Sequence, residues 1–179
     1  MPMNDNSFSI DAAITHVYDV PIPKDALMQF LSQPKTFEAY MPSVRKVEYV
    51  GASSDGAALY EWQYDIDMPL APTLHIVIPT EYRRNGTVVT HHTPDGNAHN
   101  WMACSMTFED APESASHTYL TMNLRIRLKR ASGAELHPLG LFMGQGFMSS
   151  QMQGRMEEIA RVFVQKSVNA LAAQQNGTP

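Results

Sequence analysis

The sequence predicts an α+β domain in which a seven-stranded antiparallel sheet wraps around a long C-terminal helix. Apolar and polar residues alternate over 8–20 and in several segments between 44 and 128, which indicates strands with one buried face. Apolar residues recur at steps of three, four or seven along 148–170, as on one face of a helix. Short turns such as "NG" at 85–86 imply antiparallel pairing. Because only one strand face is apolar, we expect the final helix to cover one side of the sheet.

The first strand is predicted over Phe8–Val20, where every second side chain is apolar or aromatic. Prolines 21 and 23 end this strand, and the period then changes to a helical one. A first short helix places Leu27 and Leu31 on one face, and proline 34 ends it. A second short helix carries Phe37 and stops before proline 42.

Six further strands are predicted over 44–50, 58–68, 74–84, 88–92, 98–108 and 119–128, with a polar loop "EDAPESAS" at 109–116. The "TPDGN" segment at 93–97 suits a tight turn with a three-residue loop. That turn pairs His92 with Ala98, directs His92 and Asn100 inward, and places His91 on the outer face opposite His99. The glycines at 140, 144, 146 and 154 weaken the start of the last helix, which predicts a mobile or closely approached segment there.

The composition fits one globular domain, predicted over 8–173, with flexible termini at 1–7 and 174–179. Hydrophobic residues make up 44% of the 179 positions, and the net charge of −5 argues against nucleic acid or an anionic membrane surface as the main partner. No apolar stretch reaches the ~18 residues of a spanning helix, and the N-terminus does not resemble a signal peptide. We therefore expect a cytoplasmic protein without stable membrane insertion.

The segment "ITHVYDVPIPKDALMQFLSQPKTFEAYMPSVRKVEYVG" resembles the Bet v 1-like superfamily, also called START-like or the polyketide cyclase/dehydrase and lipid transport group. In such proteins a strand ends in a proline-containing turn, two short helices follow, and a "P-x-V-x-x-V" strand succeeds them. Pro42, Val44 and Val47 match that last motif. The resemblance covers about residues 8–173. It implies a helix-grip fold with an apolar cavity between the sheet and the C-terminal helix.

The residues predicted to face this cavity are rich in methionine and aromatic rings. The chain has 12 methionines, whose unbranched thioethers adapt to different shapes and contact rings favourably. Three polar residues on the inward faces are candidates for orienting a ligand carbonyl or hydroxyl. We therefore predict that the protein binds a hydrophobic small molecule or lipid-like ligand in this cavity. Transport of the same ligand is a possible further role. The predicted ligand-binding residues are His16, Tyr60, Trp62, Tyr64, His92, Asn100, Met102, Met122, Met148, Met152 and Met156, and Met68 and Met106 share their inward face.

Two other functions fit the same sequence. A small-molecule enzyme of the cyclase, dehydratase or hydrolase kind would use His16 or His92 as general acid or base, although no carboxylate on the inward faces orients either ring. A protein-interaction module would have a closed core and an exposed apolar patch. No catalytic residue is assigned, and no cofactor or metal is expected, because the His91–His99 pair lacks a third ligand. Cys104 is interpreted as a small buried apolar residue.

Overall fold

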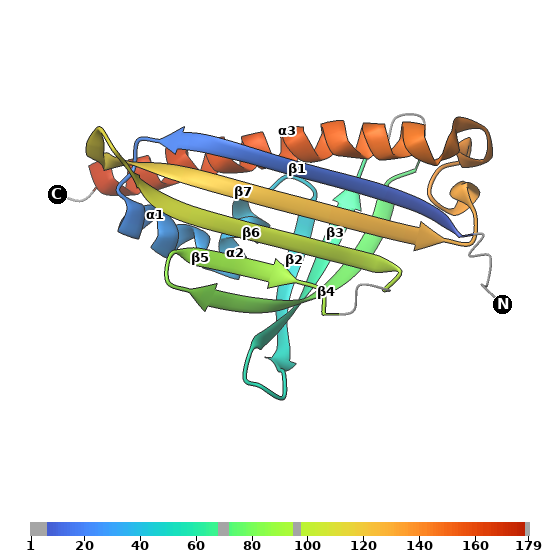
Figure 1. The fold of residues 1–179 in the computed structure, drawn as a ribbon, viewed down its shortest axis with the longest axis horizontal. Helices are drawn as coiled ribbons and strands as arrows, with labels where there is room; N and C mark the ends of the chain where they lie inside the picture. Colours follow the sequence, from blue (N-terminus) through green and yellow to red (C-terminus); the bar gives the residue numbers. More distant parts are fainter. Residues whose placement is uncertain (1–6, 68–71, 95–97, 178–179) are drawn as a thin grey trace.

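The computed structural model describes residues 7–67, 72–94 and 98–177 and has the predicted architecture. One strand is followed by two short helices, six strands and a long final helix (Figure 1). The predicted residue Met68 lies outside the described residues. The elements are β1 Phe8–Val20, α1 Lys24–Leu31, α2 Pro34–Tyr40, β2 Val44–Ala52, β3 Ala58–Ile66, β4 Leu74–Asn85, β5 Val88–His92, β6 Asn100–Ala111, β7 Ser114–Arg130, the 3₁₀ turn η1 Gly133–Glu135 and α3 Gly140–Asn176.

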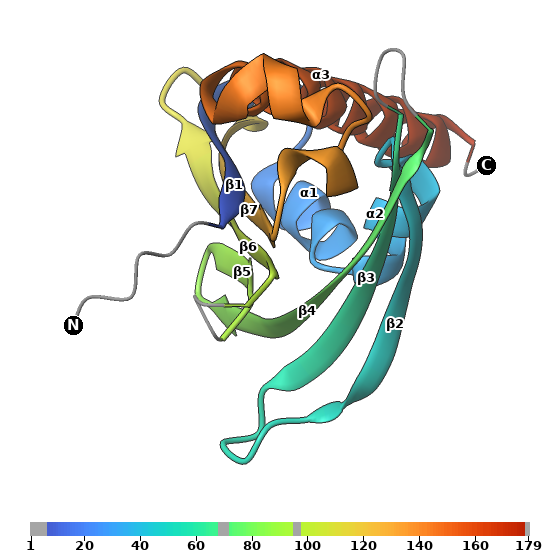
Figure 2. The same cartoon turned by 90° about the vertical axis from the view of Figure 1, so that its right-hand side faces the viewer.

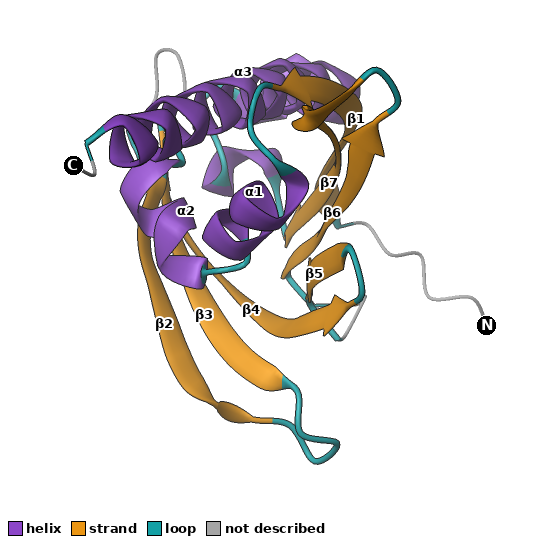
Figure 3. Cartoon of the chain, turned by 90° about the vertical axis from the view of Figure 1, so that its left-hand side faces the viewer, coloured by secondary structure: helices purple, strands orange, loops and turns teal. Residues whose placement is uncertain are grey.

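The seven strands form one antiparallel sheet in the order β1-β7-β6-β5-β4-β3-β2. Seen from its end, the sheet curves strongly, with α1 and α2 on its concave side and α3 across the open top (Figure 2). The opposite end shows the three helices gathered on this one side (Figure 3). The prediction of a single curved sheet covered on one face is confirmed, but α1 and α2 share that face with α3, whereas only the final helix was expected there.

The first strand has the predicted bounds and lies at an edge of the sheet, beside β7. Its register runs from Phe8 opposite Arg130 to Val20 opposite Thr118. Ile10 and Ala12 are buried, whereas Asp11 and Ala13, which alternate with them, are exposed, as the two-residue period requires. The backbone N–H of Asp11 donates a hydrogen bond to the Ser149 hydroxyl, so the free edge of β1 contacts α3.

The loop predicted over 109–116 is shorter in the structure, because most of this polar segment belongs to strands. Strand β6 continues to Ala111, and β7 begins at Ser114. The pairing of Asp110 with Thr118 and of Ala111 with Ser114 includes an irregularity between the two residues of β6. A bulge of this kind allows polar residues to remain in paired strands at the end of a long hairpin.

The predicted register between β5 and β6 is wrong. In the structure His92 lies opposite Ala103 and His91 lies opposite Cys104. Thr93 continues this pairing, because its N–H donates to the Met102 carbonyl at 2.8 Å and its hydroxyl accepts from the Met102 N–H at 3.1 Å. The connection is therefore longer than three residues. The pairing shifts by five residues, and an odd shift exchanges the two faces of β5.

The two short helices sit where the prolines place them. Pro23 is the N-cap residue of α1, whose buried face includes Leu27 and Leu31. Pro34 begins α2 at a position where a missing backbone N–H costs no helical hydrogen bond. The helix ends at Tyr40, before Pro42, and buries Phe37 against the centre of the sheet. These helices fill part of the concave side that α3 does not reach (Figure 2).

The final helix runs for 37 residues and is bent near its start. Gly144 has φ 73° and ψ 158°, a non-helical conformation that favours glycine. Gly140 lies so close to Gly133 that a β-carbon on it would be 2.0 Å from the Gly133 carbonyl oxygen. The prediction of a closely approached segment is confirmed at Gly140. Among the described residues, no helix combines the length and the apolar character that crossing a bilayer requires.

Candidate functional site

The space between the concave face of the sheet and α3 contains most of the predicted ligand-binding residues. Strand β3 contributes Trp62 and Tyr64 to it, and the half-buried Tyr60 lies two residues before them. These positions share one face because successive strand residues alternate. The buried methionines of this space are Met102 and Met106 from β6, Met122 from β7, and Met148, Met152 and Met156 from α3.

The part of this space around Trp62 and the buried methionines is filled by the protein's own side chains. Met106, Met122 and Met148 are 0% exposed, and Trp62 is 1% exposed, so no water-sized void adjoins these side chains. The rings of Phe37 and Phe163 stack with centroids 4.8 Å apart. The expected open cavity is therefore absent around these residues. Long unbranched thioethers reach across the gap between sheet and helix and fill it.

The centre of this interior is occupied by His91, a residue that sequence analysis placed outside. Its imidazole ring is 0% exposed, and neither ring nitrogen has a hydrogen-bond partner among the described residues. Burial lowers the pKa of His91 from 6.5 to about 3, so the ring is neutral near pH 7. A neutral imidazole offers one N–H donor and one nitrogen acceptor. His91 is therefore a buried group with two unused hydrogen-bonding positions.

Four aromatic side chains surround the His91 ring, and they come from three separate elements. The ring centroid of Trp62 is 4.9 Å away, that of Tyr82 5.1 Å, and that of Phe37 5.5 Å. Tyr60 follows at 6.4 Å. The planes of Trp62 and Phe37 are tilted by 78° and 75° from the imidazole, as edge-to-face contacts require. We refer to Phe37, Tyr60, Trp62, Tyr82 and His91 as the aromatic cluster.

Two further polar groups lie in the same interior. The Tyr64 hydroxyl donates to the Met102 sulfur at 3.2 Å, which is a weak acceptor, and burial raises the pKa of Tyr64 well above 10. Burial also raises the pKa of Cys104, which lies opposite His91 on β6, to about 12. The thiol is therefore not an activated nucleophile, which agrees with the prediction for this cysteine. The indole N–H of Trp62, by contrast, donates to the Thr80 hydroxyl at 3.0 Å.

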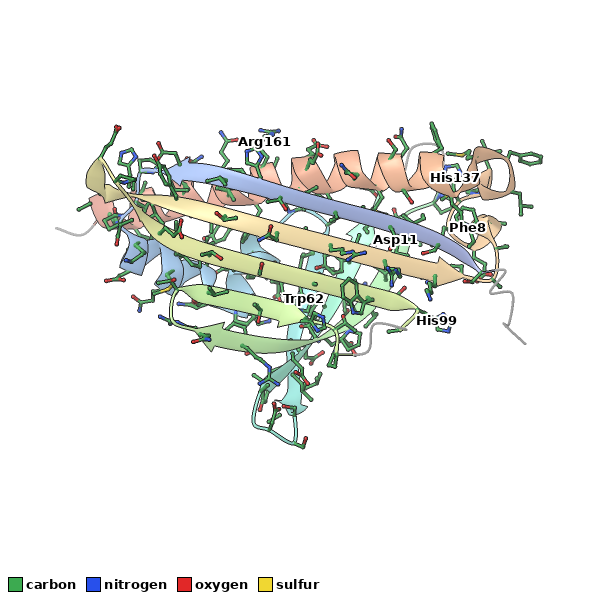
Figure 4. All side chains as sticks on the ribbon, viewed as in Figure 1. Phe8, Asp11, Trp62, His99, His137 and Arg161 are labelled. Carbon is green, nitrogen blue, oxygen red and sulfur yellow. The ribbon has the colours of Figure 1, made fainter. Side chains whose placement is uncertain are left out.

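A row of tyrosines connects the aromatic cluster to the surface. Tyr49 of β2 lies opposite Tyr60 of β3, with ring centroids 5.6 Å apart, and Tyr60 lies 6.2 Å from Tyr82. Tyr49 is 59% exposed, whereas Tyr60 and Tyr82 are half-buried. The exposure therefore falls along this row towards His91. In Figure 4 the buried Trp62 lies near the middle of the view, and the exposed residues His99 and Arg161 lie near its margin.

The three predicted polar candidates do not reach this interior. His92 is exposed on the outer face, with its ring 5.4 Å from that of Trp101, because the register of β5 differs from the predicted one. His16 is exposed in a surface groove between β1 and α3, where its ring contacts Tyr18 at 4.5 Å. Asn100 starts β6 at the rim, where its amide nitrogen donates to the Val77 carbonyl and its oxygen accepts from Arg130.

The predicted opposition of His91 and His99 is also wrong, since His91 faces Cys104. No group of three or more histidine, cysteine, aspartate or glutamate side chains within the described part of the chain could hold a metal ion. The N-cap residue and the first turns of α3 instead expose four large apolar side chains, which we call the α3 patch. Its members are Leu139, Leu141, Phe142 and Phe147, and Phe142 is 86% exposed.

No family model matches this chain, and no curated protein matches it. The chain is similar in structure to the aromatase/cyclase Zhui from a Streptomyces species, with a TM-score of 0.67, 12% identity, and coverage of 92% of this chain and 95% of that one. A START superfamily protein from Mycobacterium smegmatis gives a TM-score of 0.61 at 10% identity, covering 88% and 98%. Ara h 8.0201 gives a TM-score of 0.58 at 6% identity, covering 91% and 99%.

These comparisons establish the class of fold. The chain has the Bet v 1-like, or START-like, helix-grip fold, as the pattern of its first fifty residues predicted. At identities of 6–12%, the similarity shows that the fold is shared and does not show that the activity is shared.

Proposed function

We propose that this protein binds a hydrophobic small molecule or lipid-like ligand between the concave face of the sheet and α3. The observation that supports this most is the composition of that space, where thioethers from both sides meet aromatic rings. Met102 and Met122 face it from the sheet, and Met152 faces it from the helix. Such side chains change rotamer and repack around different apolar shapes more readily than branched ones. A cytoplasmic location is part of the same proposal.

Because the space is filled in this structure, binding requires the protein's side chains to give way to the ligand. The methionines are the side chains best suited to this, since each has three rotatable bonds. The bend at Gly144 supports a route at one end, because the helix there is already interrupted and a β-carbon on Gly144 would meet no atom within 4 Å. The tyrosine row at Tyr49 supports a second route.

Native mass spectrometry of the purified protein tests the proposal directly. We expect a mass increment from a co-purified small molecule, or saturable one-to-one binding of the neutral fluorophore N-phenyl-1-naphthylamine. A Phe142→Ser variant serves as the control, because it removes the most exposed apolar side chain of the α3 patch and leaves the interior unchanged. Binding that persists in this variant is located in the interior. The absence of both a co-purified molecule and fluorophore binding would contradict the proposal.

A second function, that of a protein-interaction module with a closed core, is favoured by two specific observations. The interior is filled, and the α3 patch exposes four large apolar side chains close together in sequence. This function predicts no co-purified small molecule. It also predicts that fluorophore binding occurs on the surface and is lost in the Phe142→Ser variant, which is the reverse of the outcome expected for an interior ligand.

The enzyme alternative required His16 or His92 to face the interior, and neither does. Both of its candidate histidines, His16 and His92, are exposed, and neither adjoins the aromatic cluster. Their exposure gives no support to a general acid or base inside an enclosed pocket.

A further inference from the structure

His91 is a fully buried polar side chain whose polar atoms have no compensating hydrogen bond among the described residues. Both of its nitrogens are buried and lack a hydrogen-bond partner among the described residues. Buried polar groups in native proteins are nearly always paired, and each exception calls for a physical explanation. A phenylalanine or leucine would fill this position without that cost. The imidazole therefore requires an explanation other than packing.

The surroundings of His91 define what kind of partner could pair with it. Four aromatic rings lie against the imidazole, and the titratable ones among them, Tyr60 and Tyr82, are phenols. The residue opposite His91 is Cys104, whose thiol is buried. No lysine or arginine belongs to the aromatic cluster. Arg84, two residues after Tyr82 on β4, is exposed and directs its guanidinium to the Met28 sulfur. A carboxylate or phosphate placed among the rings would therefore be a buried charge without a paired counter-charge. The partner is therefore uncharged.

The shape of the cluster favours a flat ring over an alkyl chain. Aromatic side chains bound the imidazole at centroid distances from 4.9 to 6.4 Å, a range in which ring pairs attract one another in tilted geometries. A ligand ring inserted among these side chains would replace their contacts with one another by similar contacts with the ligand. A saturated chain would lose those contacts and would leave the His91 nitrogens unpaired.

We propose that His91 is the polar anchor of the ligand site and that the ligand is an uncharged aromatic molecule bearing a hydroxyl group. The hydroxyl donates to the free imidazole nitrogen, or accepts from the imidazole N–H, while its ring packs among Phe37, Trp62 and Tyr82. This inference rests on the proposed function, because it assigns the chemical class of the same ligand. It makes His91 the specificity-determining residue of the interior.

Two features of the structure are consistent with this role. The tyrosine row gives an aromatic molecule a path lined with rings, from the exposed Tyr49 past Tyr60 to His91. The ring of Tyr64 also contacts Trp62, and its hydroxyl donates to a thioether sulfur, which is a weak acceptor. A second oxygen on the ligand would be a better acceptor for this O–H.

The test compares 2-naphthol with 2-methylnaphthalene, which have nearly the same size and differ by a hydroxyl in place of a methyl group. Transfer out of water favours the methyl compound, so tighter binding of the naphthol reports a hydrogen bond in the site. By isothermal titration calorimetry we expect the wild-type protein to bind 2-naphthol about tenfold more tightly. The His91→Phe variant should lose this preference. The His92→Phe variant is the matched control, because the neighbouring ring is exposed on the opposite face, and it should keep the preference.

The outcomes separate the two proposals. If the wild-type protein binds both compounds but without preference, or if His91→Phe keeps the preference, the anchor is overturned and the binding function stands. If neither compound binds, the anchor is overturned, and the binding function is decided separately by native mass spectrometry and fluorophore binding. Should His91→Phe fail to fold, ¹⁵N spectra of the wild-type histidine rings decide. A shift of the His91 nitrogens with 2-naphthol and not with 2-methylnaphthalene supports the anchor, and equal spectra overturn it.

Discussion

Acid should destabilise this protein through His91, and replacing this residue with phenylalanine should remove that effect. In the unfolded chain the imidazole takes up a proton near pH 6.5, whereas in the folded protein burial lowers the pKa of His91 to about 3. Between these values the unfolded state binds more protons than the folded state. The free energy of unfolding therefore falls as the pH falls from 6.5 towards 3.

The magnitude follows from the same two values. Each pH unit between them changes the stability by up to 1.36 kcal/mol, so the loss between pH 7 and pH 5 is about 2 kcal/mol. The titratable groups packed against or opposite His91 are the phenols of Tyr60 and Tyr82 and the thiol of Cys104. Phenols and thiols do not titrate in this range, so they do not alter the sign. Against a typical total stability of about 5–15 kcal/mol, this loss is large enough to measure.

Urea unfolding of the wild-type protein and of His91→Phe, at pH 7 and at pH 5, provides the measurement. The other six histidines and the carboxylates are common to both proteins, so their contributions cancel in the difference between them. At pH 7 we expect His91→Phe to be at least as stable as the wild type, because an unpaired buried polar group is removed. At pH 5 its advantage should be larger by about 2 kcal/mol. A difference that does not change with pH would refute the assignment of His91 as a buried neutral ring.

Three further substitutions test the interior and the final helix. Met152→Lys should lower the free energy of unfolding by about 3 kcal/mol or more in a urea titration, because a charge replaces a side chain that is 3% exposed. The control Gln151→Lys, on the exposed side of the helix, should change it by under about 0.5 kcal/mol. Gly144→Ala should cost about 1–3 kcal/mol, since its φ of 73° disfavours a side chain, and Gly146→Ala should stabilise by up to about 1 kcal/mol in thermal unfolding. Trp62→Phe removes the indole N–H that donates to the Thr80 hydroxyl, and we expect the free energy of unfolding to fall by about 1–3 kcal/mol. If the urea midpoint of this variant equals that of the wild type, the hydrogen bond does not contribute to stability.

Much of the fold is predictable from residues that alternate clearly. In β1 the even-numbered side carries most of the apolar residues, such as Ile10 and Ala12, whereas the odd-numbered side is mostly polar and its apolar residues Ala13 and Val17 are exposed. The two-residue period therefore indicates which face is buried. The same holds for β3, where Trp62 and Tyr64 share one face and acidic residues the other. The helical methionines at 148, 152 and 156 follow a four-residue step, which determines the buried side of α3. In each case the chain itself carries the full pattern.

The candidate site depends on a strand for which this pattern is ambiguous. Strand β5 reads "VVTHH", so each of its faces carries one valine and one histidine, and either face could be the buried one. The choice is made by the pairing of β5 with β6, where His91 lies opposite Cys104. The length of the connection between the strands sets that pairing, and turn residues alone do not specify it.

The sequence by itself therefore determined the order of the elements, the apolar side of the long strands and the methionine face of the last helix, because these depend on local periodicity. The tertiary structure alone decided that His91 is inside and His92 outside, and that thioethers and rings close the space between the sheet and the helix. Strand register and side-chain packing are set by contacts between residues far apart in the chain, and a local pattern does not contain them.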